Sequence, residues 1–363
     1  MAGFSANTTA MQSMAAQLTR MSTDVAAIRA HLGKIDPSAF TGLTLPIRGK
    51  FEDVLHQRVS AAVDAQTAAY QAGFEISQTA ASYQQQDHAQ SAAFDAKIPD
   101  SPQIEWPYDV ESTDKKNAPA YTDVNDPQGR LVEPKDYQDE MQWKPKLETD
   151  AGNVVSFVRQ VIKWIIGVDP LQSCEELAAG NWAEIRQFSD RFNNASWAFR
   201  DCSDNIHDGQ NSSEQDWTGN AADGARNYLA QLANGFYGEA DRNEFLANQL
   251  KDFAEGVFDA MNILTEILGD WVNARLLPAI AALGLAGATE AIPVVDFITD
   301  GVAGYTAYEA IQAGLEVYEQ ANKINTTIEA FATSFGIINN GNFKSPNPDW
   351  QIPSKPYVSP VSG

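Results

Sequence analysis

The chain has 363 residues, with 25 basic and 48 acidic side chains and a formal net charge of −23. This charge would repel phosphate backbones and anionic lipid headgroups, which argues against nucleic-acid binding and electrostatic attachment to membranes. The length exceeds that of one ordinary hydrophobic core, so two or three domains are expected. Alanine and glutamine are abundant and strand-like alternation is scarce, which predicts an all-α fold.

The first helical segment is predicted from apolar residues that recur at spacings of three and four between Met11 and Leu32. Gly33 ends this pattern, and a turn region that contains Phe40-Thr41-Gly42 follows. A second apolar seam runs from Phe51 to Ala80. Residues 1–97 are therefore predicted to form an antiparallel helical hairpin.

The end of this hairpin carries the sequence Tyr83-Gln84-Gln85-Gln86-Asp87. An aromatic residue and a carboxylate four positions apart share one face of a helix and make a two-point epitope for a partner. We expect both side chains to project from the end of the helix. Tyr237 with Asp241 has the same spacing but lies inside an apolar-periodic segment, so we interpret Tyr237 as a packing residue.

A linker is predicted at residues 98–150, which are acidic, rich in proline and without apolar periodicity. Low hydrophobicity with net negative charge cannot offset chain entropy, so an extended or disordered segment is expected, with Trp106, Tyr108 and Trp143 available to contact a domain surface. Residues 339–363 are rich in Pro, Asn and Ser and are expected to form a flexible tail.

A second helical domain is predicted at residues 151–338. A short amphipathic helix ends near Gly167, and a further seam from Trp182 to Ile206 predicts a long helix. Trp217-Thr218-Gly219 then forms a turn, and a return helix is expected to reach about Trp271. Three glycines are places where this helix could bend: Gly235, Gly238 and Gly256. More apolar helices are expected from residue 272 onward.

The arrangement of a helix, the turn Trp217-Thr218-Gly219 and an antiparallel helix resembles the W-x-G hairpin superfamily of type VII (ESX-type) secretion substrates. The first hairpin is similar, with Phe40 in the place of the tryptophan and Gly42 in the place of the glycine. Tyr83 and Asp87 match the Tyr-x-x-x-Asp/Glu export motif of this superfamily. Residues 167–171 and 180–182 are similar to the start of such hairpins in large actinobacterial members.

This resemblance implies a secreted or cell-envelope protein that is recognised by the type VII secretion ATPase and exported as a folded helical dimer. Three partners of the hairpins remain open: a small W-x-G hairpin protein, a second copy of this chain, or pairing of the two hairpins within the chain. Antiparallel pairing within the chain would bring Tyr83 and Asp87 close to the aromatic-glycine turn of the other hairpin. The first residues contain no basic n-region and no continuous apolar h-region, so no cleaved secretory signal is expected.

Catalytic patterns are not found in the sequence, so we expect no enzymatic activity, cofactor or metal. The histidines His31, His56, His88 and His207 lack metal-ligand spacing, and no Cys-x-x-Cys pair, phosphate-binding glycine loop or nucleophile elbow is present. The densest polar cluster, Asp201, Asp204, His207 and Asp208, is interpreted as a solvated helix end. The alternative function is the delivery module of a secreted polymorphic toxin whose activity is cryptic or on another chain.

Two apolar features have plain interpretations. Leu276 to Val295 is the least charged window and is long enough for a membrane span, but it contains Pro278 and Pro293. We interpret it as two buried core segments and expect no stable membrane insertion. Cys174 and Cys202 provide no disulfide framework, and we favour reduced core thiols over a bridge between them.

Overall fold

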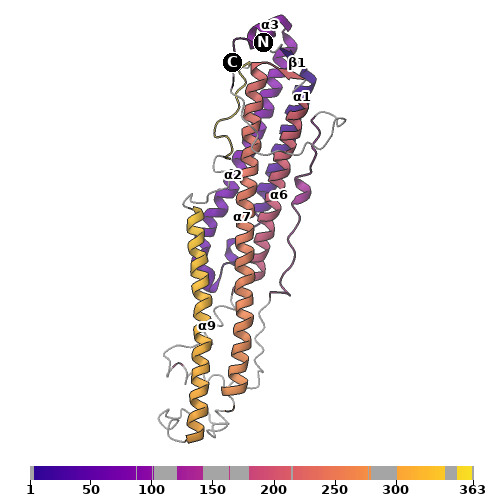
Figure 1. Ribbon diagram of the computed structural model, residues 1–363. Helices are drawn as coiled ribbons and strands as arrows, with labels where there is room; N and C mark the ends of the chain where they lie inside the picture. Colours follow the sequence, from indigo (N-terminus) through magenta and orange to yellow (C-terminus); the bar gives the residue numbers. More distant parts are fainter. Residues whose placement is uncertain are drawn as a thin grey trace.

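The computed structural model describes residues 4–86, 88–99, 101, 121–141, 163, 180–213, 216–276, 278, 301–339 and 350–361. The fold is all-α, as the sequence predicts, with one pair of two-residue strands in this part of the chain. Long helices lie side by side in an elongated bundle (Figure 1). Asp87, Trp106, Tyr108, Trp143 and Cys174 lie outside the described residues, as do residues 167–171.

The first hairpin consists of α1 (Thr8–Leu32) and α2 (Leu45–Gln85), followed by the short α3 (His88–Asp95). The Asn7 side chain caps α1 by accepting a hydrogen bond from the Ala10 N–H at 3.2 Å. The predicted seam of α1 is buried, and the helices approach closely because α2 presents alanines and Gly73 to α1. A Cβ on Gly73 would lie 2.9 Å from the Ala15 carbonyl oxygen.

The second hairpin consists of α6 (Trp182–Ser213), the strand β2 (Trp217–Thr218) and α7 (Asn220–Asp270), followed by the short π-helix η5 over Trp271–Leu276. The return helix therefore reaches Trp271, as predicted. Asn181 and Glu184 form a reciprocal pair at the start of α6, where the Asn181 Oδ1 accepts from the Glu184 N–H at 3.3 Å. The last long helix is α9 (Gly301–Asn339).

The two hairpins pack antiparallel, with α1 against α6 and α2 against α7. At one end, Phe40 and Phe51 of the first hairpin meet Phe188 near the start of α6, with ring centroids 6.2 and 5.7 Å apart. At the other end, β1 (Ser5–Ala6) pairs antiparallel with β2. The turn of each hairpin therefore lies against the open end of the other.

Beyond the turn of the first hairpin, α7 continues and pairs with α9 (Figure 1). Phe253 of α7 stacks on Phe331 of α9 with ring centroids 3.9 Å apart. Trp271 is buried against α9 at Gly314, where a Cβ would lie 3.0 Å from the indole ring. Glycine at this position allows the large ring to close the contact between the two helices.

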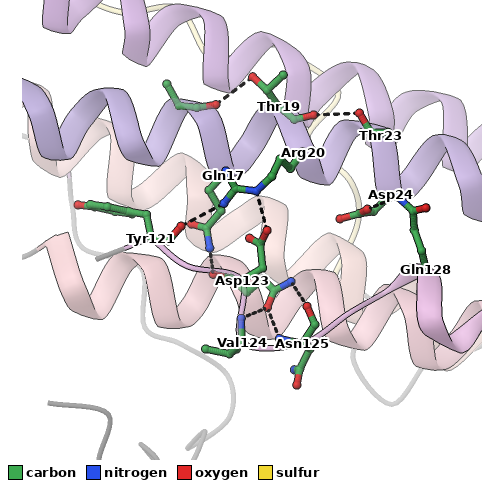
Figure 2. A network of polar contacts seen from close by, with 12 residues as sticks. Gln17, Thr19, Arg20, Thr23, Asp24, Tyr121, Asp123, Val124, Asn125 and Gln128 are labelled. Carbon is green, nitrogen blue, oxygen red and sulfur yellow. Dashed lines mark hydrogen bonds and ion pairs between the residues drawn. The ribbon is translucent and has the colours of Figure 1, made fainter. Parts of the chain in front are cut away.

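The middle of the predicted linker, residues 121–141, packs across α1 and α6, and we call it the strap (Figure 2). Arg20 of α1 binds the Asp123 carboxylate at 2.7 Å and the Tyr121 carbonyl oxygen at 3.1 Å. The Asn205 Oδ1 of α6 accepts hydrogen bonds from the N–H groups of Val124 and Asn125, each at 2.9 Å. These polar contacts hold the strap where its composition predicts an extended or disordered chain.

The tail also differs from its expectation of flexibility at residues 350–361, which lie against α7 and α2. Arg242 of α7 donates to the Trp350 carbonyl oxygen at 3.1 Å. Gly235 and Gly238 are where this segment crosses α7, since a Cβ on either would lie 3.0 Å or less from it. These two glycines therefore provide room for a passing chain.

Candidate functional site

The strongest candidate site is the end of the bundle where the tail of the first hairpin meets the turn of the second. We call it the bundle tip, formed by Phe4–Asn7, Tyr83, Asp95 and Asp216–Ala221. The strands β1 and β2 hold it together, and the Ser5 and Thr218 hydroxyls share a hydrogen bond of 2.9 Å. The Asn7 N–H donates to the Asp216 carbonyl oxygen at 2.7 Å. Segments from both hairpins are therefore fixed here.

Tyr83 is buried at the bundle tip, with 7% of the residue exposed, so the expectation that it projects from the helix is wrong for this conformation. Its ring packs edge-on against Phe4, with centroids 5.4 Å apart and planes at 75°. In addition, α2 ends at Gln85 and Gln86 is extended, so the helical face that begins at Tyr83 is not continued beyond that point. The sequence pattern assumed one unbroken helix through this motif.

The pKa of the Tyr83 hydroxyl is raised by its surroundings. Burial is the main cause because it disfavours the phenolate, and the Asp95 carboxylate adds to it, while the Trp217 side chain acts in the opposite direction. Among the described residues, neither the Tyr83 hydroxyl nor the Trp217 indole N–H has a hydrogen-bond partner of normal geometry. Buried polar atoms without partners are rare in proteins, so this pair is a distinctive feature of the bundle tip.

Trp217 and Gly219 form the turn of the second hairpin inside the bundle tip. Trp217 is only 2% exposed, and the Arg226 guanidinium donates to its carbonyl oxygen. Gly219 has φ 119° and ψ 179°, a region of backbone space that is almost restricted to glycine. A Cβ there would also lie 2.9 Å from the Cγ of Asp95. The glycine is required by both the backbone and the approaching carboxylate.

Asp95 is a site residue that the sequence analysis missed. Gly219 precedes α7 and has no side chain to cap it, and the Asp95 carboxylate supplies the cap from the first hairpin. Its two oxygens accept from the Asn220 and Ala221 N–H groups, both at 2.9 Å. A carboxylate at a helix N-terminus also interacts favourably with the helix dipole. An uncapped glycine before α7 was the only signal in the sequence, and it did not identify the acid.

The turn of the first hairpin lies at the other end of the bundle. Phe40 is fully buried, with its ring 4.8 Å from that of Phe51, and Gly42 has φ 55°. The structure therefore brings Tyr83 together with Trp217 and Gly219 and keeps it apart from Phe40 and Gly42. This is the juxtaposition that antiparallel pairing of the hairpins predicts.

The polar cluster on α6 is not a solvated helix end, because α6 continues to Ser213 and covers all four residues. Asp201 is buried and accepts from Arg130 of the strap at 2.7 Å. Burial is the main cause that raises the pKa of Asp204 and lowers that of His207. A cavity of about 370 Å³ beside Asp201 and Asp204 is lined also by Trp197 and Tyr237. The cluster anchors the strap.

Other sequence predictions concern metals, thiols and membranes. Within the described residues, no group of three or more His, Cys, Asp or Glu side chains is arranged to hold a metal ion. Cys202 is a buried free thiol, and burial raises its pKa well above the usual range. No described helix combines the length and apolar character needed to cross a membrane. In the window from Leu276 to Val295, only Leu276 and Pro278 are described.

Comparisons with known proteins find no matching family model, no similar curated protein and no similar solved structure.

Proposed function

We propose that this chain is a non-enzymatic substrate or secretion-associated component of a type VII (ESX-type) secretion system and is exported as a folded helical bundle. The observation that supports this most is the bundle tip, where Tyr83 of one hairpin lies beside Trp217 and Gly219 of the other. In the resemblance to W-x-G hairpins, Tyr83 belongs to the export motif, and Trp217 and Gly219 form the hairpin turn. One end of the bundle thus combines both elements.

The dimer implied by the resemblance is formed within the chain in this proposal. The buried Gln17 of α1 donates to the Asn205 carbonyl oxygen of α6 at 3.0 Å. Arg58 of α2 pairs with Glu239 of α7 at 2.9 Å, and both side chains are largely buried. A buried ion pair is costly to break because each charge would be left unpaired. Each hairpin therefore covers the surface of the other hairpin to which a separate small partner would bind.

The type VII ATPase is the proposed receptor of the bundle tip. Tyr83 and Trp217 are buried there, so a receptor would bind the Tyr83 side chain after this end of the bundle opens. The proposed location of the protein after export is the medium or the cell envelope. Asp87, the second half of the motif, is carried into this proposal from the sequence alone.

The test compares culture filtrate and lysate by immunoblot, in strains with and without the ATPase gene. Tyr83→Ala and Asp87→Ala should abolish export, and Tyr83→Phe separates the hydroxyl from the ring, since it keeps the packing against Phe4. Tyr70→Phe is the matched control because Tyr70 is exposed on the same helix. Normal export of Tyr83→Ala and Asp87→Ala proteins, or export that persists without the ATPase, would refute the proposal.

A further inference from the structure

Residues 350–361 form an extended segment that we call the latch, and it runs along α7 and reaches α2 (Figure 1). At its beginning, the Trp350 ring packs edge-on against Tyr237 of α7, with centroids 5.4 Å apart and planes at 88°. Near its end, the Ser359 N–H donates to the Glu75 carboxylate of α2 at 3.0 Å. The latch therefore joins the two helices that belong to different hairpins.

The end of the latch lies next to Tyr83. The Ser359 hydroxyl shares a hydrogen bond with Thr79, which is one helical turn before Tyr83 on the same face of α2. Tyr357 is buried and its ring lies 5.4 Å from that of Tyr228 on α7. The pKa of Tyr357 is raised mainly by burial and then by the nearby Tyr83. The end of the latch therefore lies beside the part of the bundle tip where Tyr83 packs against Phe4.

Gly235 and Gly238 form a notch in α7 that fits the backbone of the latch. A Cβ on Gly235 would lie 2.8 Å from the Ile352 Cα, and a Cβ on Gly238 would lie 3.0 Å from the Trp350 Cβ and still closer to the Trp350 carbonyl oxygen. Glycine inside a helix costs about 0.5–1 kcal/mol relative to alanine. Close approach of the latch gives these two glycines a structural reason inside α7.

We propose that the latch is a releasable cover of the export site: while residues 350–361 are bound to α7 and α2, Tyr83 stays buried, and Tyr83 reaches a receptor only after the latch leaves. The consequence for export rests on the proposed function, whereas the control of Tyr83 exposure does not. The latch is suited to release because it is an extended segment held by side chains and a few hydrogen bonds, and local opening of such a segment needs no unfolding of the helices beneath it.

The full-length variant Gly235→Ala/Gly238→Ala tests this cover by filling the notch. The matched control is Gly256→Ala/Gly269→Ala, since both of these glycines lie on α7 with open space around their Cβ positions. Alanine favours the helix at all four positions, so the two variants differ in the clash with the latch. Tyr357→Ser releases the latch from its own side and provides a second route.

The first measurement is the rate of Tyr83 nitration by tetranitromethane, mapped by peptide mass spectrometry, together with hydrogen exchange of residues 350–361. We expect the notch variant and Tyr357→Ser to lose exchange protection in the latch and to nitrate Tyr83 about tenfold faster, because reaction follows the population of the open form. The control variant should behave as the parent does. The exposed Tyr70 serves as an internal standard with an equal rate in all proteins.

The outcomes separate the cover from the export function. An unchanged Tyr83 nitration rate after the latch has lost its protection would overturn the proposal, and so would full protection of the latch in the notch variant. Faster nitration with more protein in the culture filtrate would support both the cover and the export function. Faster nitration with export that depends on neither Tyr83 nor the latch would keep the cover and refute the proposed function.

Discussion

The two hairpins turn through the same local pattern, an aromatic residue followed two positions later by glycine, yet their surroundings differ. Phe40 and Gly42 turn the first hairpin in an apolar setting, where Phe40 meets Phe51 and Phe188. Trp217 and Gly219 turn the second hairpin in a polar setting, with a strand pair, the Arg226 guanidinium and the Asp95 carboxylate around them.

The shared pattern therefore specifies a turn and a buried ring but does not specify a recognition site. Both rings are buried by residues of the opposite hairpin, which makes each turn part of the contact between the hairpins. The second turn brings the Trp217 indole next to Tyr83 at the tail of the other hairpin, whereas the first turn meets the start of α6. Single substitutions in each turn test this difference.

The largest effect is expected from Trp217→Ala. Its ring is almost fully buried, so truncation should lower the free energy of unfolding by about 3–5 kcal/mol through lost apolar contacts and a cavity. Urea denaturation followed by circular dichroism measures this change. Trp197→Ala is the control, since that ring is 44% exposed and should cost much less. A Trp217→Ala protein as stable as the parent would mean that the ring does not support the tip.

Next in size is Gly219→Ala. Its φ of 119° with extended ψ is a region that side chains rarely adopt, and the added Cβ would meet Asp95, so a loss of about 1–3 kcal/mol is expected. Gly42→Asn should cost less, because φ 55° is close to the left-handed helical region that asparagine tolerates. The same denaturation experiment compares them. Equal losses would show that the two turns are equally strained.

Asp95→Asn should cost about 1–2 kcal/mol, since it removes a charged acceptor from the start of α7 and leaves a weaker cap. Hydrogen exchange at the Asn220 and Ala221 amides should become faster. Asp223→Asn in the first turn of the same helix is the control, because its carboxylate is partly exposed and pairs with Arg226. If both variants lose the same stability, the cap from the first hairpin has no special role.

A smaller, pH-dependent effect is expected at the end of α1 beside the first turn. The pKa of His31 is lowered from 6.5 to about 4, first by burial and then by Arg191 and Lys34, while Glu133 opposes this. Between these pH values the unfolded chain binds more protons than the folded one, so stability should fall as pH drops from about 6.5 towards 4.

Thermal melting of the parent and His31→Leu over this pH range isolates the contribution of His31. The variant should lose less stability on acidification than the parent does, because its side chain cannot take up a proton. His56→Leu is the control at an exposed position. Parallel curves for the parent and His31→Leu would contradict the expected role of burial.

The all-α fold, the hairpins and the reach of α7 to Trp271 could be predicted from the sequence. Apolar spacing of three and four is a local property that places one face of each helix in a core, whatever covers that face. The turn glycines were also predictable from local sequence. Gly42 and Gly219 both have positive φ, as tight turns require. Trp217 was identified by its position before such a glycine.

The segments that cover each helix face could not be predicted, because they come from distant parts of the chain. Asp95 caps a helix whose start is more than a hundred residues away, and the strap and the latch bind through polar groups that local composition associates with loose chain. Tyr83 was expected to project from the end of its helix, but it is buried at the bundle tip, where its ring packs against Phe4. Such contacts join residues far apart in sequence, so their energies depend on the packed arrangement and leave no local periodicity to read.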